Sequence, residues 1–414
     1  MKKLPELLAP AGTLDAFKTA ILYGADAIYA GLPGFSMRAR AKITTDEVKQ
    51  GIDLAHGAGK KVYLAFNLFA HDHEYANLSR VSDVINYLRP DALIVSDPGI
   101  MMWVRENHPD MPIHISTQAN ICSAQSVKFW QNAGAKLCVL SREVSHSEFK
   151  TIRAACPDIG LEIFVHGAMC MAYSGRCLLS NFMTGRPANR GACAQLCRWK
   201  YDVILRECQS GREMSLTEDQ RGAYIMNSRD LCLMPRLGEV IESGPDSLKI
   251  EGRNRSEYYV GSVVHAYRAA LDSYAADPEN FDPAPFQADL NILESRGYTT
   301  AFFDGHLGPD AHDYETTRSS SDYHAACVIT SATPQEIVLE LRNEINANDE
   351  ITFLLPGTMD RETVKLPRII NAANGQEVPK LSAGQHNSII IPREWLSGAH
   401  SDKFVPLVLA YKHK

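Results

Sequence analysis

Short β-rich runs alternate with helical segments along the first two thirds of this chain, and this alternation constrains the fold more than any other feature. Glycine or proline marks most of the boundaries between runs and helices. The intervening segments, such as Asp46 to His56 and Ser123 to Asn132, carry apolar residues at three- and four-residue intervals. The pattern is typical of βα units and a parallel sheet. Eight runs can be counted: Glu6 to Leu8, Ala27 to Ala30, Val62 to Asn67, Ala92 to Asp97, Ile113 to Gln118, Leu137 to Arg142, Leu161 to His166 and Ser247 to Arg253.

Eight units predict a (β/α)8 barrel over residues 1–276, close to the usual size of about 250 residues. A doubly wound open sheet stays an alternative, because periodicity does not distinguish the two. Residues 168–222 form a cysteine-rich insertion after the seventh strand, and residues 277–322 read as a linker and helical extension. Repeated short alternating runs in residues 323–414 predict a small antiparallel β-barrel domain.

In such a barrel the carboxyl ends of the strands form the functional face. Lys249, Glu251 and Arg253 share one face at the end of the eighth strand, by alternation. Because a barrel interior excludes lone charges, these three residues either pair internally or bind an anion. Other polar side chains that end strands are Asn67, Gln118, Asn120, Arg142 and His166.

Four of the 10 cysteines, namely Cys170, Cys177, Cys193 and Cys197, lie among Gly, Ser, Asn, Arg and Pro, which indicates a loop. A 414-residue chain does not need disulfide staples, so this cluster favours four-thiolate metal ligation. Scattered free thiols or a redox pair remain alternatives. Cysteines in apolar surroundings are interpreted as buried free thiols: Cys122, Cys138, Cys156 and Cys327.

Prolines and a charge at Pro5, Glu6 and Pro10 interrupt the region where a signal peptide needs an apolar stretch. The sequence also lacks a run of about eighteen apolar residues that could span a bilayer. We therefore expect a soluble, cytoplasmic protein with no membrane partner.

The cysteine-rich segment is also basic. Its cations include Arg176, Arg186, Arg190 and Arg198, and a second short basic stretch follows the second strand at Arg38 to Lys42. The whole chain has a net charge of -7, so affinity for nucleic acid would have to come from this local patch. Solvated surface arginines are the ordinary alternative.

Hydrolase motifs are missing from the sequence, which contains neither HExxH nor GxSxG. A cysteine protease would need a thiolate beside a positioned histidine, and Cys170 near His166 is the obvious pair.

Several stretches resemble the signature of the collagenase-like peptidase family of unassigned catalytic type, family 32. They span about the whole chain: Leu8 to Gly12, Glu162 to Cys170, Gly175 to Ser180, Ala192 to Trp199, Asn227 to Leu231, Ser247 to Arg253 and Arg296 to Tyr298. The chain looks most like the branch that hydroxylates the wobble uridine of certain tRNAs at carbon five, without dioxygen and with prephenate as hydroxyl source. Relatives act on ribosomal RNA cytidine or on ubiquinone precursors.

The resemblance implies a four-iron four-sulfur cluster held by Cys170, Cys177, Cys193 and a fourth thiolate. We expect Cys197 as the fourth ligand, with Cys208 or Cys232 as alternatives. The sequence does not separate an iron-sulfur cluster from a structural zinc, since both accept four thiolates.

The expected partners are tRNA and prephenate. A homologous partner subunit is a further candidate, because quinone-branch relatives work in pairs. Forked guanidinium groups suit the two carboxylates of prephenate, and Arg253, Arg142 or Arg38 could supply them. The candidate catalytic residues are Lys249, Glu251, Arg253, Gln118 and His166, and the candidate substrate-binding residues are Arg38, Asn67, Arg142, Arg176 and Arg198. A collagenase-like peptidase and a non-catalytic subunit of a heteromeric hydroxylase are the alternative functions.

Overall fold

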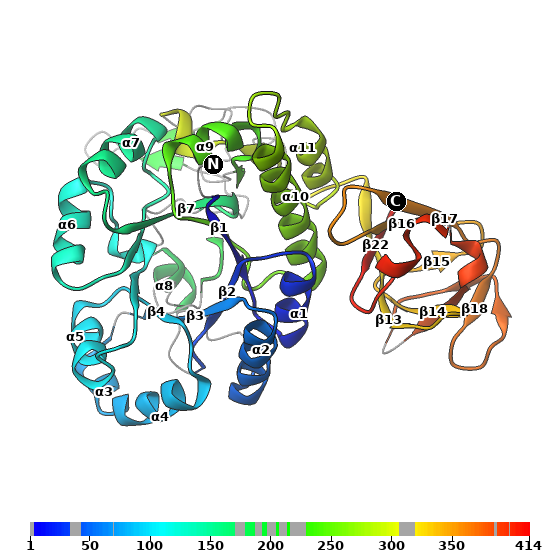
Figure 1. The fold of residues 1–414 in the computed structure, drawn as a ribbon, viewed down its shortest axis with the longest axis horizontal. Helices are drawn as coiled ribbons and strands as arrows, with labels where there is room; N and C mark the ends of the chain where they lie inside the picture. Colours follow the sequence, from blue (N-terminus) through cyan, green and yellow to red (C-terminus); the bar gives the residue numbers. More distant parts are fainter. Residues whose placement is uncertain are drawn as a thin grey trace.

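A closed barrel and a smaller β domain make up the chain in the computed structural model (Figure 1). The structure describes residues 4–33, 43–68, 70–169, 179–186, 193–196, 204–206, 213–215, 229–305, 319–384, 387–396 and 398–414.

Within these ranges, eight parallel strands form the barrel in the order β11, β1, β2, β3, β4, β5, β6, β7. Pairing of β11 with both β1 and β7 closes the ring, which excludes an open sheet and confirms the predicted barrel. The strands are β1 (Glu6–Pro10), β2 (Ala27–Gly31), β3 (Lys61–Phe66), β4 (Ala92–Val95), β5 (Ile113–Ile115), β6 (Leu137–Val139), β7 (Gly160–Gly167) and β11 (Ser247–Ile250).

Helices surround the barrel in the order of the chain (Figure 1). Their first turns are capped as the sequence dictates; Thr44 and Ser145, for example, form capping boxes with Glu47 and Glu148. The helices of the barrel domain are α1 (Leu14–Leu22), α2 (Thr45–Gly57), α3 (Asp72–Tyr75), α4 (Leu78–Leu88), α5 (Pro98–Asn107), α6 (Ala124–Asn132), α7 (His146–Ala155), α9 (Leu237–Ser243) and α10 (Glu257–Ala276), followed by α11 (Ala284–Asn291).

Strand alternation divides the core into two parts. Residues such as Leu7, Ile28 and Val62 face the helices and join one large apolar cluster. Residues of opposite parity, such as Leu8, Tyr29 and Tyr63, form a separate cluster inside the barrel. Both faces of each strand are therefore buried, as expected for a parallel sheet covered by helices.

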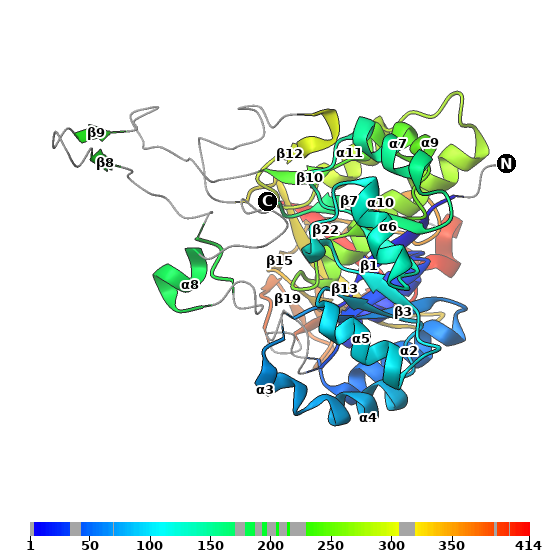
Figure 2. The same cartoon turned by 90° about the vertical axis from the view of Figure 1, so that its left-hand side faces the viewer.

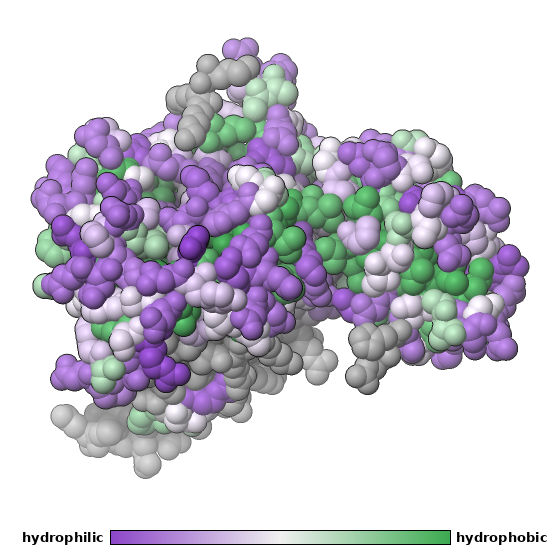
Figure 3. All heavy atoms as spheres, turned by 60° about the horizontal axis from the view of Figure 1, so that its bottom comes forward, coloured by the Kyte–Doolittle hydropathy of each residue, from purple (hydrophilic) through white to green (hydrophobic). Residues whose placement is uncertain are grey.

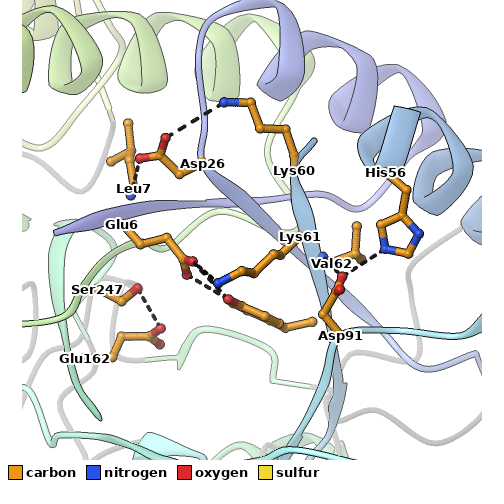
Figure 4. Close-up of polar contacts among 11 residues, drawn as sticks. Glu6, Leu7, Asp26, His56, Lys60, Lys61, Val62, Asp91, Glu162 and Ser247 are labelled. Carbon is orange, nitrogen blue, oxygen red and sulfur yellow. Dashed lines mark hydrogen bonds and ion pairs between the residues drawn. The ribbon is translucent and has the colours of Figure 1, made fainter. Parts of the chain in front are cut away.

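Three aspartates tie neighbouring strands together at the amino-terminal end of the barrel. Asp26, Asp91 and Asp246 each lie directly before a strand. Their carboxylates accept hydrogen bonds from the backbone N–H groups of Leu7 at 2.9 Å, Val62 at 2.7 Å and Leu161 at 2.9 Å, respectively (Figure 4 shows the first two). This end of the barrel is thus built for stability, in keeping with (β/α)8 barrels in general.

The segment after β7 leaves the barrel on the side opposite the N-terminus, where α8 (Leu179–Thr184) and the paired strands β8 (Ile204–Arg206) and β9 (Glu213–Ser215) project (Figure 2). The chain returns through β10 (Asp230–Cys232), which pairs antiparallel with the end of β7 and parallel with β12 (Tyr298–Thr299). Strands β10 and β12 therefore extend the sheet at the rim of the barrel mouth.

The C-terminal domain is a curled antiparallel sheet with its own apolar core, which confirms the predicted small β domain. Within the described ranges its main sheet has the order β17, β16, β22, β13, β14, β21, β18, β19, and β15 pairs with β20. Its strands are β13 (Tyr323–Ala332), β14 (Glu336–Leu341), β15 (Ile345–Asn346), β16 (Glu350–Leu354), β17 (Arg361–Lys365), β18 (Ile369–Asn371), β19 (Glu377–Val378), β20 (Lys380–Leu381), β21 (Ser388–Pro392) and β22 (Leu409–His413).

This domain packs against α1 and α10. The Tyr23 hydroxyl donates to the backbone oxygen of Leu354 at 2.9 Å and accepts from the backbone N–H of Leu409 at 3.0 Å. His265 of α10 is hydrogen-bonded to the backbone oxygen of Thr358 at 2.7 Å. Apolar surface also gathers where the two domains meet (Figure 3), so the interface combines buried hydrogen bonds with apolar contact.

Within the described residues, no helix is both long enough and apolar enough to cross a membrane.

Candidate active site at the barrel mouth

Lys249 lies inside the barrel and pairs with a charge that the sequence analysis did not select. Its Nζ donates to Glu162 Oε1 at 2.7 Å, and the two side chains are 5% and 1% exposed. Ser247 donates to the other carboxylate oxygen of Glu162 at 3.0 Å (Figure 4). Of the two alternatives left open for Lys249, internal pairing is therefore the one observed. The sequence did offer a signal for this role, because Glu162 is the one charged residue in the otherwise apolar run from Leu161 to Val165.

A second charged pair lies beyond the carboxyl ends of β6 and β11. Arg142 Nη2 is 3.5 Å from Glu251 Oε2, and both side chains are 11% exposed. The guanidinium carbon of Arg142 also lies 3.8 Å from the centre of the Phe164 ring. A cation held between a carboxylate and a ring face keeps its geometry before any ligand arrives, so this arrangement presents a pre-oriented guanidinium group at the mouth.

Arg253 is buried beside the same mouth, with its guanidinium carbon 5.9 Å from the centre of the Tyr29 ring. The loop that carries Arg253 touches the loop after β1, because a Cβ at Gly12 would lie 1.9 Å from the backbone oxygen of Arg253. Gly167, at φ +115°, likewise lets the loop after β7 approach Glu251, whose backbone oxygen would be 2.6 Å from an added Cβ. The lack of a side chain at these two positions thus allows the loops after β1, β7 and β11 to pack closely at the mouth.

His166 points away from Phe164 and the barrel interior, because β7 contains a register shift opposite Lys249 and Ile250 that aligns His166 with Ile250. Its ring lies 6.0 and 5.7 Å from the rings of Tyr259 and Tyr267 on α10, and 5.3 Å from Tyr298 of β12. Nδ1 is buried and has no hydrogen-bond partner in the part of the chain that the structure describes. The catalytic role expected for His166 stays a prediction, and its ring does not join Lys249 and Phe164.

The remaining polar candidates lie on other strand ends. Gln118 follows β5 in a 3-10 turn (Thr117–Ala119), where its backbone N–H is 3.4 Å from Ser116 Oγ. Asn67, directly after β3, is buried, and its backbone oxygen accepts from Ser96 Oγ at 2.9 Å. Three predicted substrate-binding residues lie outside the described residues: Arg38, Arg176 and Arg198.

Among the four predicted cluster ligands, Cys193 is the one within the described residues; Cys170, Cys177 and Cys197 lie outside them, as does Cys208. Cys193 is exposed, and its sulfur accepts from the backbone N–H of Gln195 at 3.3 Å. The surroundings of Cys193 therefore fit a metal or cluster ligand.

Cys232, the alternative fourth ligand, has different surroundings. Its side chain is 1% exposed, and Sγ lies 3.2 Å from Gln287 Oε1. Burial raises the pKa of Cys232 to about 11, which favours the protonated thiol. Among the described residues, no group of three or more His, Cys, Asp and Glu side chains could hold a metal ion.

A pocket lies beside the carboxyl ends of β6 and β7 and the start of β10. It encloses about 440 Å³, counting its opening to solvent. Arg142, Phe164, Phe149 and Phe303 are among its lining residues. Arg142 of the charged pair at the mouth is therefore also a lining residue of this pocket.

Acid should unfold this barrel through two buried histidines, His114 and His166. Burial lowers the pKa of each imidazole from 6.5 to about 3. The unfolded chain therefore binds these protons below pH 6.5, whereas the folded protein does not until about pH 3. The free energy of unfolding should fall as the pH drops through this window, by about 1.4 kcal/mol per pH unit for each histidine, and these groups should have no effect above it.

Urea unfolding at pH 7, 6 and 5 measures this dependence. The variant His166→Phe removes one of the two groups, so its stability should depend less steeply on pH than that of the wild type. An identical pH dependence for the two proteins would contradict the assignment.

Fold and site together define a (β/α)8-barrel protein with a charged site at the carboxyl ends of its strands and an appended β domain. Residues 12–313 match the model of peptidase family U32, and the chain belongs to that family.

Relatives named for RNA hydroxylation match most of the chain. The chain is 41% identical over 357 residues to tRNA hydroxylation protein P of Escherichia coli K12, and the match covers 77% of this chain and 78% of the relative. It is 37% identical over 358 residues to tRNA hydroxylation protein P1 of Bacillus subtilis 168, covering 86% and 84%. The 23S rRNA 5-hydroxycytidine C2501 synthase of Escherichia coli K12 is 37% identical over 268 residues, covering 65% of this chain and 39% of the relative.

Proposed function

We propose that this protein hydroxylates the wobble uridine of tRNA at carbon five, without dioxygen, using prephenate as the source of the hydroxyl group. The observation that carries the proposal is the similarity, over more than three quarters of the chain, to relatives named tRNA hydroxylation proteins. The named rRNA hydroxycytidine synthase supports the same chemistry on a related base.

The proposal includes an iron-sulfur cluster held by Cys170, Cys177, Cys193 and Cys197, with zinc as the alternative metal. A bound cluster supplies single-electron chemistry that protein side chains lack. The exposed Cys193 sulfur, with its N–H donor, suits this role better than the buried thiol of Cys232.

Prephenate carries two carboxylates, and Arg142 and Arg253 are the guanidinium groups at the described mouth that suit them. Glu251 and the Phe164 ring orient Arg142, while the Lys249–Glu162 pair forms the floor beneath. Gln118 and Asn67 complete the rim as candidate contacts to substrate.

The tRNA would approach the side from which α8 projects (Figure 2). Phe182 on that helix is 89% exposed, a suitable platform for stacking on an unstacked base. A tRNA substrate also supports the expected cytoplasmic location.

The alternative function is that of a peptidase, as the family name implies. A thiol peptidase would need a histidine with access to its nucleophile. The His166 ring lies within 6.0 Å of three tyrosine rings, and burial lowers its pKa to about 3, so its surroundings do not suit the base of a thiol peptidase.

Nucleoside analysis of tRNA from a strain lacking this chain tests the proposal. We expect loss of 5-hydroxyuridine and of nucleosides derived from it, and recovery when this chain alone is restored. Unchanged tRNA would refute the proposal, and recovery that required a second subunit would favour the heteromer. Proteolytic activity that survives rigorous repurification would favour the peptidase.

A further inference from the structure

Two arginines, Arg296 and Arg255, pair with a single buried carboxylate at the rim of the barrel mouth, and a third, Arg229, directly precedes that carboxylate in the chain. Asp230, the first residue of β10, is 3% exposed. One of its oxygens is 2.5 Å from Arg296 Nη2, and the other is 3.8 Å from Arg255 Nη2. Arg229 directly precedes Asp230. Its side chain packs against Gly297, because a Cβ added at Gly297 would lie 3.5 Å from the Cδ and Nε atoms of Arg229.

Among the described residues, the Asp230 carboxylate pairs with both Arg296 and Arg255, so one negative charge is shared by two guanidinium groups. The pair of Asp230 with Arg296 is the closest and is fully buried, with both side chains under 5% exposed. Arg255 is 33% exposed and stands 5.0 Å from the centre of the Tyr259 ring. Nε of Arg229 is buried without a hydrogen-bond partner in the described ranges. Arg229 and Arg255 are thus the cations available to a ligand.

The cluster lies on the rim of the barrel mouth, where a large substrate that reaches the mouth would pass over it. Strand β10 pairs with the end of β7, with Leu231 opposite Gly167. Arg255 lies in the loop between β11 and α10. The two available arginines therefore come from two rim segments and sit where the cysteine-rich segment returns to the barrel.

A guanidinium group withdrawn from water gains most from a ligand that accepts two hydrogen bonds and carries negative charge. A phosphate diester meets both conditions, and the backbone of an RNA offers such groups on the outside of the chain. We propose that Arg229 and Arg255 bind the phosphate backbone of the RNA substrate, with Asp230 and Arg296 positioning them. This inference rests on the proposed function, since it takes RNA as the substrate.

The test is tRNA binding by the full-length protein as a function of salt. Each phosphate contact contributes about 0.7 to 0.9 to the slope of log Kobs against log salt. We expect the slope to fall by about that amount in Arg229→Gln and in Arg255→Gln, with affinity reduced for all tRNA sequences alike. Lys136→Gln removes one charge at the start of β6, at the opposite end of the barrel, and should leave the slope unchanged.

Folding and function are kept separate in this design. Arg255 is partly exposed, so its variant should fold even if Arg229→Gln does not. Arg229→Lys keeps the charge and loses the fork, and should retain the slope while lowering affinity. Wild-type protein that does not bind tRNA would refute the proposed function. If the wild type binds tRNA and both glutamine variants keep the wild-type slope, this inference alone is overturned. Variants that raise only the KM for prephenate would overturn it as well.

Discussion

Replacing Cys193 with alanine should abolish both the brown colour of anaerobically purified protein and the hydroxylation of uridine. A cluster that loses one of four thiolates loses a covalent anchor and a negative charge that balances the iron. Absorbance in the visible charge-transfer region measures the cluster, and nucleoside analysis of tRNA from cells carrying the variant measures the reaction. Cys170→Ala should behave in the same way.

Two control variants sharpen this experiment. Cys138→Ala removes a fully buried thiol of β6 and should keep both colour and activity. Cys232→Ala should keep the colour if Cys197 is the fourth ligand, and should lose it if Cys232 is. Normal tRNA modification by a colourless Cys193 variant would show that the reaction does not need the cluster. Metal analysis that found zinc instead of iron would show that the site holds zinc.

Replacing Lys249 with methionine should destabilise the protein by about 3–5 kcal/mol, because it leaves the Glu162 carboxylate buried without its partner. The two side chains are 5% and 1% exposed, so water cannot take the place of the ammonium group. Ser247 still donates to Glu162, but a neutral hydroxyl does not balance the charge. Urea unfolding at neutral pH measures the loss.

The double variant Glu162→Leu with Lys249→Met should regain most of this stability, since it removes both charges together. Lys61→Met is the exposed counterpart: this side chain is 61% exposed and 3.5 Å from Glu6, so its loss should cost under about 1 kcal/mol. Equal losses for Lys249→Met and Lys61→Met would contradict the buried-pair account. Hydroxylation by a stable double variant would show that Lys249 is structural and not catalytic.

The amino-acid sequence determined the order and position of the barrel strands. The eight predicted runs overlap β1 to β7 and β11, because alternation and helical periodicity are local properties of the chain; the runs predicted for β5, β6 and β11 extend three residues too far. It also predicted that Lys249, Glu251 and Arg253 share one face at the end of the eighth strand; β11 ends at Ile250, so Glu251 and Arg253 lie in the loop that follows it. Family membership followed from motifs that are contiguous in sequence.

Tertiary structure decided which charges meet. Glu162 is 87 residues from Lys249, and Asp230 is 66 residues from Arg296, so neither pair leaves a local signal. The register shift in β7 turned His166 toward α10 and away from the mouth, although alternation alone aligns His166 with Phe164. Pairing between strands, closure of the ring and burial act between segments far apart in the chain, so they fixed the partners and protonation states of residues whose identities the sequence had already supplied.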